Sequence, residues 1–490
     1  MLIGLDVGTT SVKAVAYDPD PGRALAIVSH PTPIVHPRPG WSDFPPEALW
    51  EAVVATVRDL TARLPADARV EALGIASVGE AGLPLDASHT PLYPIIAWFD
   101  PRGEEYTEAW RRRFPERELY AITGHTVRSL YTVFKLLWLW DHHPEVMARM
   151  ATWLFVGDYI AFRMTGEVAT VPTLAARSLL FDVVRRQWNP DLVAAARLRV
   201  DQLPPVVEAG VPVGRLRADV ARAMGLPAGL PITLAGHDHP VGMLAAGLYG
   251  TQSAVDSSGT AQAIATLTSH FIGPRGCDAG VTCYPFVVGG VYLLQGGMAT
   301  AGAALQWLAD LITEGDVARL LALAERAPAG SRGAGCVPFF RGTGTPYRRP
   351  GARAAFFNLD LDHGPEEVAR ALVEGLACFL AENIALLEGL VGRTVGEIRA
   401  IGGGNRSPFL LRVKASMVRR PLLRVDVPEA VGTSAALIAG LACGRFATPE
   451  EAVASLHMPT TAIAPVPEWS DVYDDVYARY RQWATFAVNA

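Results

Sequence analysis

Hydrophobic and polar residues repeat one arrangement in the two halves of the chain. Near the N-terminus an apolar run ends in Asp6, and a second apolar run resumes after Lys13, which predicts a β-hairpin. Half a chain later Asp256 ends another apolar run, and Gly259 and Thr260 precede the next one. Two hairpins of this kind favour a duplicated fold that holds a nucleotide between its halves.

Apolar runs alternate with amphipathic segments along both halves, which indicates α/β layers. In the first half we expect strands within 1–30, 72–78 and 232–235, and helices at 47–63, 103–114, 131–140, 146–163 and 241–247. In the second half we expect strands at 252–267, 281–295 and 397–401, and helices at 299–313, 316–326 and 365–390. The stretch 327–358, rich in Gly, Pro and Arg, is predicted to be a long ordered loop.

Length and composition limit the class of protein. With 490 residues, 50% of them hydrophobic, the chain is long enough for two domains, which we place at 1–247 and 248–490. A net charge of -6 without a basic block argues against a nucleic-acid partner. Five scattered cysteines fit a reducing cytoplasm, and the longest apolar stretch, 435–443, is too short to cross a bilayer. We expect a soluble cytoplasmic protein with no membrane partner.

The turn of the first hairpin has the composition of a phosphate-binding turn. Glycine and small hydroxyl residues leave backbone N–H groups and hydroxyls free for a phosphate chain, and Asp6 beside them could hold Mg²⁺. Lys13 could contact phosphate or lie along the hairpin surface. An ordinary hairpin turn is the alternative interpretation. The residues concerned are Gly8, Thr9, Thr10 and Ser11.

Asp238 is the first candidate for a catalytic residue. It follows a buried strand and precedes a helix, where an acid could accept a proton from a substrate hydroxyl while that oxygen attacks phosphorus. A helix-capping role is the structural alternative. Its neighbours His237 and His239 also allow a metal-dependent hydrolase, although adjacent residues point in different directions and at most two of the three could reach one ion.

Two further groups of residues could bind ligands. Gly402, Gly403, Gly404 and Asn405 follow a strand, at the position where α/β folds bind nucleotides. In the first half an acid and an aromatic residue that could stack on a carbon skeleton suggest a polyol pocket. A turn Glu and a core Trp beside an Asp–Arg pair are the alternatives. These first-half residues are Gly79, Glu80, Trp98, Asp100 and Arg102.

Taken together, these motifs resemble the FGGY family of sugar and polyol kinases, within the actin-like ATPase superfamily. The resemblance covers most of the chain, and its strength is the shared order and spacing of the motifs. Besides the two hairpin turns and the Gly236-His237-Asp238 turn, it includes the segments 135–141, 158–167, 177–182, 302–307, 401–408 and 432–436.

The resemblance implies two ribonuclease-H-like domains with an inter-domain cleft, in which the first binds sugar and the second mainly binds ATP. Asp238 would be the general base, and Asp6 would help to place Mg²⁺. The implied sugar contacts are Gly79, Glu80, Trp98, Asp100, Asp238 and His239. The implied ATP contacts are Gly8, Thr9, Thr10, Ser11, Lys13, Gly259, Thr260, Gly302, Gln306, Gly403, Gly404 and Asn405.

The sequence departs from the family pattern on the substrate side. Glycerol kinases have an Arg-Glu pair, and xylulose kinases a Met-His pair, where this chain has Gly79-Glu80. His239 also differs from the residue that most members carry there. We therefore expect an ATP- and Mg²⁺-dependent kinase for a ketopentose such as xylulose or ribulose, with dimerisation possible. A kinase for glycerol, another polyol or a sugar acid is the alternative, and a non-catalytic nucleotide switch is the alternative from another class.

Overall fold

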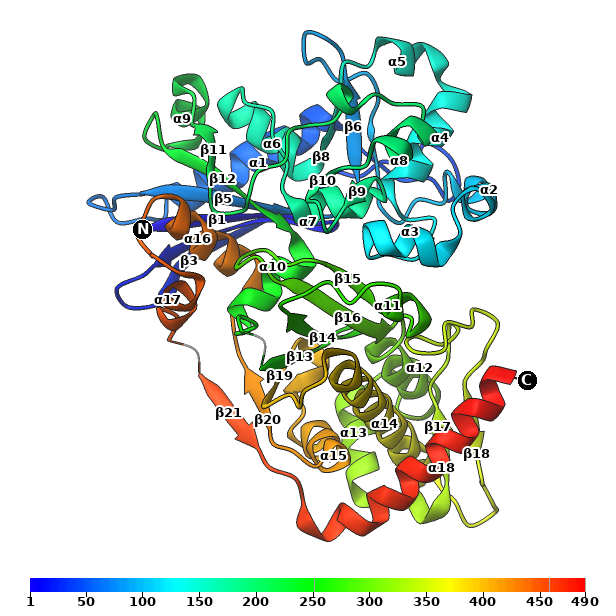
Figure 1. Ribbon diagram of the computed structural model, residues 1–490. Helices are drawn as coiled ribbons and strands as arrows, with labels where there is room; N and C mark the ends of the chain where they lie inside the picture. Colours follow the sequence, from blue (N-terminus) through cyan, green and yellow to red (C-terminus); the bar gives the residue numbers. More distant parts are fainter. Residues whose placement is uncertain (251, 458, 490) are drawn as a thin grey trace.

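The computed structural model describes residues 1–250, 252–457 and 459–489. The molecule has two lobes, each built on one large mixed sheet (Figure 1). The sheet of the first lobe has the strand order β11-β12-β5-β1-β2-β3. Its strands are β1 (Leu2–Val7), β2 (Ser11–Asp18), β3 (Arg23–Pro31), β5 (Ala72–Ser77), β11 (Pro212–Arg215) and β12 (Pro231–His237).

The sheet of the second lobe repeats this plan and adds one edge strand, in the order β15-β16-β14-β13-β19-β20-β21. In each sheet an antiparallel hairpin lies beside two parallel strands, β1 with β5 and β12 in the first and β13 with β19 and β20 in the second. The predicted duplication is confirmed. The strands are β13 (Ser253–Ser258), β14 (Gln262–Thr268), β15 (Thr282–Pro285), β16 (Tyr292–Met298), β19 (Glu397–Ile401), β20 (Leu422–Val425) and β21 (Thr460–Ile463).

Most predicted helices of the first half are present, but the predicted helix at 146–163 is wrong. A buried strand, β8 (Thr152–Phe155), interrupts it and pairs with β6 (Gly82–Leu85), because Trp153, Leu154 and Phe155 fill the core there. The helices are α1 (Pro46–Thr61), α2 (Thr107–Arg113), α3 (Glu116–Thr123), α4 (Thr132–His142), α5 (Pro144–Arg149), α6 (Val156–Thr165), α7 (Pro172–Ala175), α8 (Pro190–Ala195), α9 (Ala218–Met224) and α10 (Asp238–Ala245). Two short ribbons complete this half, β4 (Asp43–Phe44) with β7 (Ile95–Ile96) and β9 (Phe181–Asp182) with β10 (Gln187–Trp188).

Most helices of the second half lie in the second lobe (Figure 1). The predicted loop at 327–358 also contains a short ribbon, β17 (Gly335–Val337) with β18 (Ala355–Phe357). The helices are α11 (Arg275–Asp278), α12 (Gly302–Ile312), α13 (Val317–Arg326), α14 (Pro365–Val391), α15 (Pro408–Val418), α16 (Ala430–Ala442), α17 (Pro449–Ala454) and α18 (Ser470–Asn489). No helix in the described ranges is long and apolar enough to cross a membrane.

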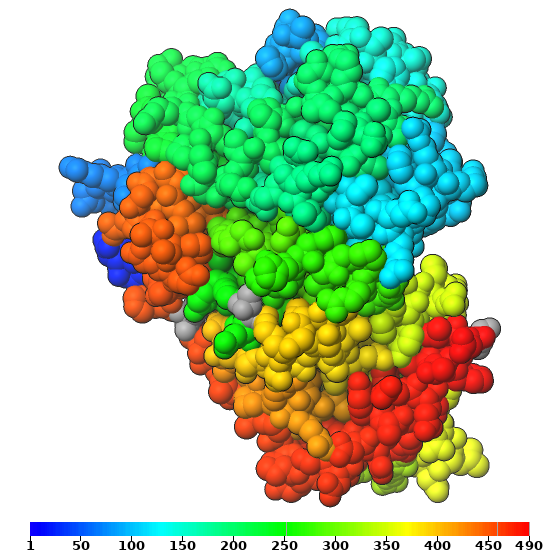
Figure 2. All heavy atoms as spheres, in the orientation of Figure 1, coloured from blue at the N-terminus to red at the C-terminus, as the bar shows by residue number. Residues whose placement is uncertain are grey.

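Helix α16 comes from the second half of the sequence but packs on the sheet of the first lobe, against β1 and β5. Glycines permit the close approach, since a Cβ on Gly4 would overlap the carbonyl oxygen of Gly432. The space-filling view shows this C-terminal segment, in orange, beside the blue N-terminal strands (Figure 2). The first lobe therefore includes more than residues 1–247, and a single boundary near 248 does not describe the packing.

The lobes also meet where β15 approaches the end of α3. The backbone N–H of Cys283 on β15 donates a 2.9 Å hydrogen bond to the carbonyl oxygen of Gly124, just after α3. Two ion pairs, Arg117 with Asp278 and Arg348 with Glu116, lie around this contact. Tyr284 of β15 thereby reaches Arg177 of the first lobe.

Candidate active site

The predicted site residues gather where parallel strands end. Val7, Ser77 and His237 are neighbours in the register of β1, β5 and β12, so the segments after these strands lie side by side. They carry the Gly8 turn, Glu80 and Asp238. In the second sheet Ser257 pairs with Ile401, which brings the Gly259 turn next to the Gly402 turn. Both sets occupy the carboxyl ends of strands, the usual ligand-binding edge of an α/β sheet.

Asp238 is the first residue of α10 and is held by its neighbours. Its Oδ1 accepts a 2.6 Å hydrogen bond from the backbone N–H of His239, and Nε2 of His237 lies 3.2 Å from the same oxygen. The side chain is 28% exposed, whereas His237 is buried. The carboxyl group is therefore fixed through one oxygen and remains accessible.

Burial raises the pKa of Asp238 well above its ordinary value, and the nearby carboxylates of Asp6 and Glu80 raise it further. Burial also lowers the pKa of His237 well below its usual range and that of His239 to about 4, so both imidazoles are neutral at pH 7. A carboxylate with a raised pKa is a good proton acceptor for a hydroxyl group, as a general base requires.

Asp6 has the features of a cation ligand. Its Oδ1 is buried and has no hydrogen-bond partner among the described residues. Burial raises the pKa of Asp6 to about 7, while Lys13 opposes and Glu429 supports the increase. A free carboxylate oxygen beside a second carboxylate, that of Asp238, fits Mg²⁺, which takes few protein ligands and completes its shell with water and phosphate.

The metal-dependent hydrolase gains no support from the arrangement of the histidines. Within the described ranges no group of three or more His, Cys, Asp or Glu side chains is placed to hold a metal ion. The rings of His237 and His239 lie 6.4 Å apart between centroids, and His237 is directed at Asp238 instead.

Glu80 is paired with an arginine that the sequence did not single out. Nε and Nη2 of Arg177 both donate to Oε1 of Glu80, with an Nε distance of 2.6 Å. Both side chains are largely buried, at 13% exposure for Arg177 and 5% for Glu80. Arg177 lies in the segment 177–182, which resembles a family motif. No local pattern in that segment indicated that Arg177 pairs with Glu80.

Aromatic side chains from both lobes surround the Arg177 guanidinium. Its central carbon lies 5.0 Å from the ring centroid of Tyr131 and 5.9 Å from that of Tyr284, a residue of β15. His125 packs between the two tyrosines, at 5.1 and 4.9 Å between centroids. The sequence indicated neither tyrosine as a site residue, because their proximity depends on how the lobes meet.

Gly79 is restricted by the same cluster. A Cβ at this position would lie 2.9 Å from Cδ2 of His237 and 3.2 Å from Cγ of Arg177. The space that a larger side chain would need is taken by these two residues. This explains physically why glycine precedes Glu80.

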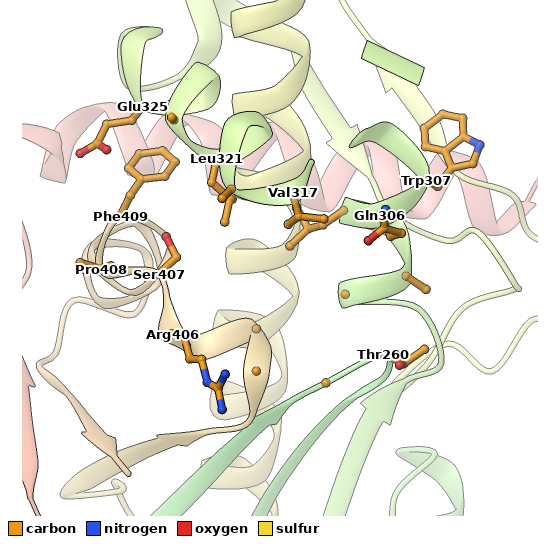
Figure 3. A pocket seen from close by; sticks show the side chains of 18 of the residues that line it. Thr260, Gln306, Trp307, Val317, Leu321, Glu325, Arg406, Ser407, Pro408 and Phe409 are labelled. Carbon is orange, nitrogen blue, oxygen red and sulfur yellow. The ribbon is translucent and has the colours of Figure 1, made fainter. Parts of the chain in front are cut away.

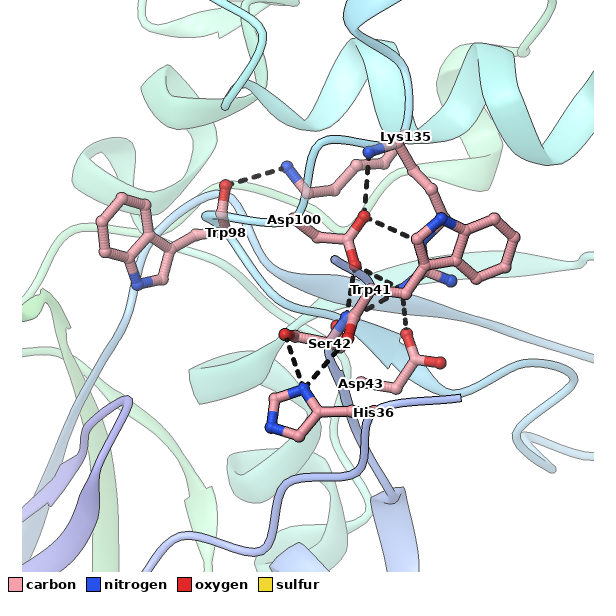
Figure 4. A network of polar contacts seen from close by, with 8 residues as sticks. His36, Trp41, Ser42, Asp43, Trp98, Asp100 and Lys135 are labelled. Atoms are coloured by element: carbon pink, nitrogen blue, oxygen red, sulfur yellow. Dashed lines mark hydrogen bonds and ion pairs between the residues drawn. The ribbon is translucent and has the colours of Figure 1, made fainter. Parts of the chain in front are cut away.

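Trp98 and Asp100 lie in different surroundings and have different hydrogen-bond partners (Figure 4). Nε1 of Trp98 donates a 2.9 Å hydrogen bond to Oγ1 of Thr9, which ties this half-exposed indole to the first phosphate turn. Asp100 is fully buried, and its carboxylate accepts hydrogen bonds from Arg102 and from the backbone N–H of Ser42. The sequence interpretation of Asp100 as a sugar contact is therefore not supported by its position, and its observed role is to hold the loop that carries Trp98.

A large cavity of about 1200 Å³ lies within the second lobe (Figure 3). Phe409, Leu321 and Glu325 are at one end and Thr260 is at the other, so the cavity combines a mainly apolar end, with one carboxylate, and a glycine-rich polar end. This combination suits a purine base joined to phosphates. Six predicted nucleotide contacts line it: Gly259, Thr260, Gly302, Gln306, Gly403 and Gly404.

Family models match both lobes. The N-terminal domain of the FGGY family of carbohydrate kinases matches residues 1–245, and the C-terminal domain of the same family matches residues 257–443. The chain belongs to the FGGY family of carbohydrate kinases. It is an enzyme that transfers a phosphoryl group from ATP to a hydroxyl group of a sugar, and its expected two-domain α/β fold is confirmed.

Individual members of the family are similar over nearly their full length. The xylulose kinase of Escherichia coli K12 is 30% identical over 459 residues, which covers 93% of this chain and 92% of that protein. The L-fuculokinase of Salmonella typhi is 29% identical and covers 93% and 95%. The crystal structure of xylulose kinase from Rhodospirillum rubrum superposes with a TM-score of 0.92 at 29% identity, over 99% and 98% of the chains.

In this FGGY kinase two predicted nucleotide contacts have other partners. Nζ of Lys13 lies 2.7 Å from the carboxylate of Glu429, at the start of α16. Asn405 is buried beneath the glycine turn, where its amide group donates to the carbonyl oxygens of Asp256 and Ile401. Trp307 and Arg406, from the motif segments 302–307 and 401–408, also line the cavity. Cavity residues that the sequence did not indicate include Asp310, Val317, Leu321 and Phe409.

Proposed function

We propose that this FGGY kinase phosphorylates a free ketopentose, such as xylulose or ribulose, and that Asp238 is its general base. The observation that carries the proposal is the Glu80–Arg177 pair beside Asp238, which offers both a carboxylate and a guanidinium to a neutral sugar. The similarity to a xylulose kinase and an L-fuculokinase supports a ketose as the acceptor.

The chemistry requires one proton acceptor and close positioning of two substrates. The sugar hydroxyl gives its proton to Asp238 as its oxygen bonds to the γ-phosphorus of ATP, and the bond from that phosphorus to the bridging oxygen breaks to release ADP. The raised pKa of Asp238 makes it a stronger base for this transfer. Trp98 and Thr9 link the sugar side to the first phosphate turn through their hydrogen bond.

We propose Asp6 as the protein ligand of a Mg²⁺ ion that lies beside the general base Asp238. The ion would neutralise charge on the phosphates when bound. The backbone N–H groups and hydroxyls of the Thr9 and Gly259 turns would hold the phosphate oxygens from the two sides. Closure of the lobes would bring the two turns together and exclude water.

The charges at the site disfavour a sugar acid. Its carboxylate would lie near those of Glu80, Asp238 and Asp6, while Arg177 is already neutralised by Glu80. A neutral ketose avoids this repulsion. We also propose a cytoplasmic location, since all five cysteines are free thiols. We propose a homodimer as well, which sedimentation of the purified enzyme would test.

Sugar-dependent release of ADP tests the proposal. The purified enzyme is given ATP and Mg²⁺ with each of a panel of ketopentoses, aldoses, polyols, glycerol and gluconate. We expect one ketopentose to give the largest kcat/KM. A stronger response to gluconate or glycerol would overturn the substrate assignment, and ADP release at one rate regardless of sugar would favour the nucleotide switch.

A further inference from the structure

Lysine is rare in this chain, which makes its positions informative. Only three of the 43 lysine and arginine residues are lysines, namely Lys13, Lys135 and Lys414. Lys135 and Lys414 are both buried. An ammonium group is compact and donates in three directions, whereas a guanidinium group is planar and larger. At these two buried positions the chain thus has the compact ammonium group, whereas the side chain of Lys13 is 29% exposed.

The ammonium group of Lys414 uses all three of its donors. Nζ donates to Oδ2 of Asp256 at 2.7 Å, to Oγ of Ser258 at 2.9 Å and to Oδ1 of Asn405 at 2.8 Å. The Lys414 side chain is 2% exposed and that of Asp256 is 0% exposed. Asp256 also accepts hydrogen bonds from Ser258 and Gln262, so its carboxylate is fully engaged.

These partners belong to the two turns that form the polar end of the nucleotide cavity. Ser258 directly precedes Gly259 and Thr260, and Asn405 directly follows Gly404. The turns are already in contact, because a Cβ on Gly402 would lie 2.5 Å from the carbonyl oxygen of Ser258. Lys414 lies on α15, beneath both turns, and none of its donors is left for a ligand.

We infer that Lys414 is a positioning residue for nucleotide binding, which holds the Gly259 turn and the Gly402 turn at the spacing that ATP requires. The inference rests on the proposed nucleotide cavity. Buried ion pairs often contribute little net stability compared with apolar residues. The Lys414–Asp256 pair acts through its geometry, since one ammonium group links side chains from two separate turns.

The test removes both buried charges together, so that neither is left unpaired. In the double variant Lys414→Met with Asp256→Asn, we expect the KM for ATP and the Kd for a non-hydrolysable ATP analogue to rise by about tenfold or more. The KM for the sugar should stay within about twofold of the wild-type value. The single variant Lys414→Arg should also bind the ATP analogue more weakly than wild type, because the guanidinium group cannot replace the three-way ammonium contact.

A second buried pair in the same lobe supplies the matched control. Nε of Arg370 donates to Glu374 at 2.9 Å within α14, and both side chains are 2% exposed. Neither residue lines the described nucleotide cavity. The double variant Arg370→Met with Glu374→Gln should lower thermal stability while the KM for ATP is unchanged. Asn405→Ala, which keeps the Lys414–Asp256 pair, should give a smaller rise in the analogue Kd and provides a second measurement if the first variant does not fold.

Three results would overturn the inference: unchanged analogue affinity in the Lys414 double variant, an equal rise in the KM for ATP and sugar, or an equal loss of nucleotide affinity in the α14 control. Binding of the ATP analogue needs no sugar. A wrong substrate assignment would therefore show as wild-type enzyme that binds the analogue but does not phosphorylate ketopentoses, which is a distinct outcome.

Discussion

Arg177 donates two hydrogen bonds to one carboxylate oxygen of Glu80, although 97 residues separate them in the sequence. The pair lies beside Asp238 and influences its pKa with opposite signs, because Glu80 raises it and Arg177 lowers it. Tyr131 and Tyr284 cover the guanidinium group from two lobes. The proposed sugar side of the site is thus a neutral ion pair surrounded by aromatic rings, and substitutions can test it.

Removal of Arg177 should weaken sugar binding specifically. Arg177→Met leaves the buried Glu80 unpaired, so we expect the sugar KM to rise by about tenfold or more and stability to fall by about 3 kcal/mol. The paired variant Glu80→Gln with Arg177→Met should recover stability but not sugar affinity. Steady-state kinetics and denaturant unfolding measure the two effects, and a normal sugar KM in both variants would contradict the assigned role.

Asp238→Asn should remove the proton acceptor while the site keeps its shape. We expect kcat to fall by about 10² to 10⁴, the range for loss of a general base, with ATP affinity nearly unchanged. Single-turnover kinetics with equilibrium binding of the ATP analogue separates chemistry from binding. Turnover close to that of wild type would exclude Asp238 as the base.

Removal of divalent cations should abolish sugar phosphorylation. We expect a chelator to stop turnover and added Mg²⁺ to restore it, and Asp6→Asn to raise the Mg²⁺ concentration for half-maximal rate by about tenfold. Asp67→Asn, at an exposed position away from the site, is the control. The assignment of Asp6 fails if both variants have the Mg²⁺ dependence of wild type.

Side chains added to the open faces of the glycine turns should block the nucleotide without unfolding the protein. A Cβ on Gly259 or Gly403 would meet no atom within 4 Å, and both residues line the cavity. We expect Gly259→Val and Gly403→Val to fold normally and to weaken ATP-analogue binding by about tenfold or more. Calorimetric binding and a thermal melt test this, and unaltered affinity would place the nucleotide elsewhere.

Lys135 should give the enzyme a stability that rises with pH in the alkaline range. Burial lowers the pKa of Lys135 from 10.5 to about 8, so the unfolded chain binds more protons than the folded protein between these values. The stability of wild type relative to Lys135→Met should therefore increase by about 2 kcal/mol between pH 7.5 and pH 10. Urea unfolding at both pH values measures the difference, and a constant difference would contradict the lowered pKa.

Local patterns predicted most elements but not every boundary. The hairpins around Asp6 and Asp256 were predicted because glycine and hydroxyl turns between apolar runs are local signals. The segment 146–163 was misassigned as one helix, because the buried strand β8 is stabilised by pairing with β6 rather than by its own pattern. For Asp100 the sequence left two alternatives, a sugar contact or a pair with Arg102, and the structure shows the pair. Its second partner, the backbone N–H of Ser42, lies 58 residues earlier and had no local signal.

The sequence by itself determined the strand-and-turn order, the two hairpins with glycine and hydroxyl turns and the position of Asp238 at a strand end, because backbone conformation and hydrophobic period depend on neighbouring residues. Only the tertiary structure decided that Arg177 pairs with Glu80, that Tyr284 reaches the first lobe, that α16 covers the first sheet and that Lys414 links two turns. Those contacts depend on strand register and on how close glycines let helices approach, and these are properties of the packed chain.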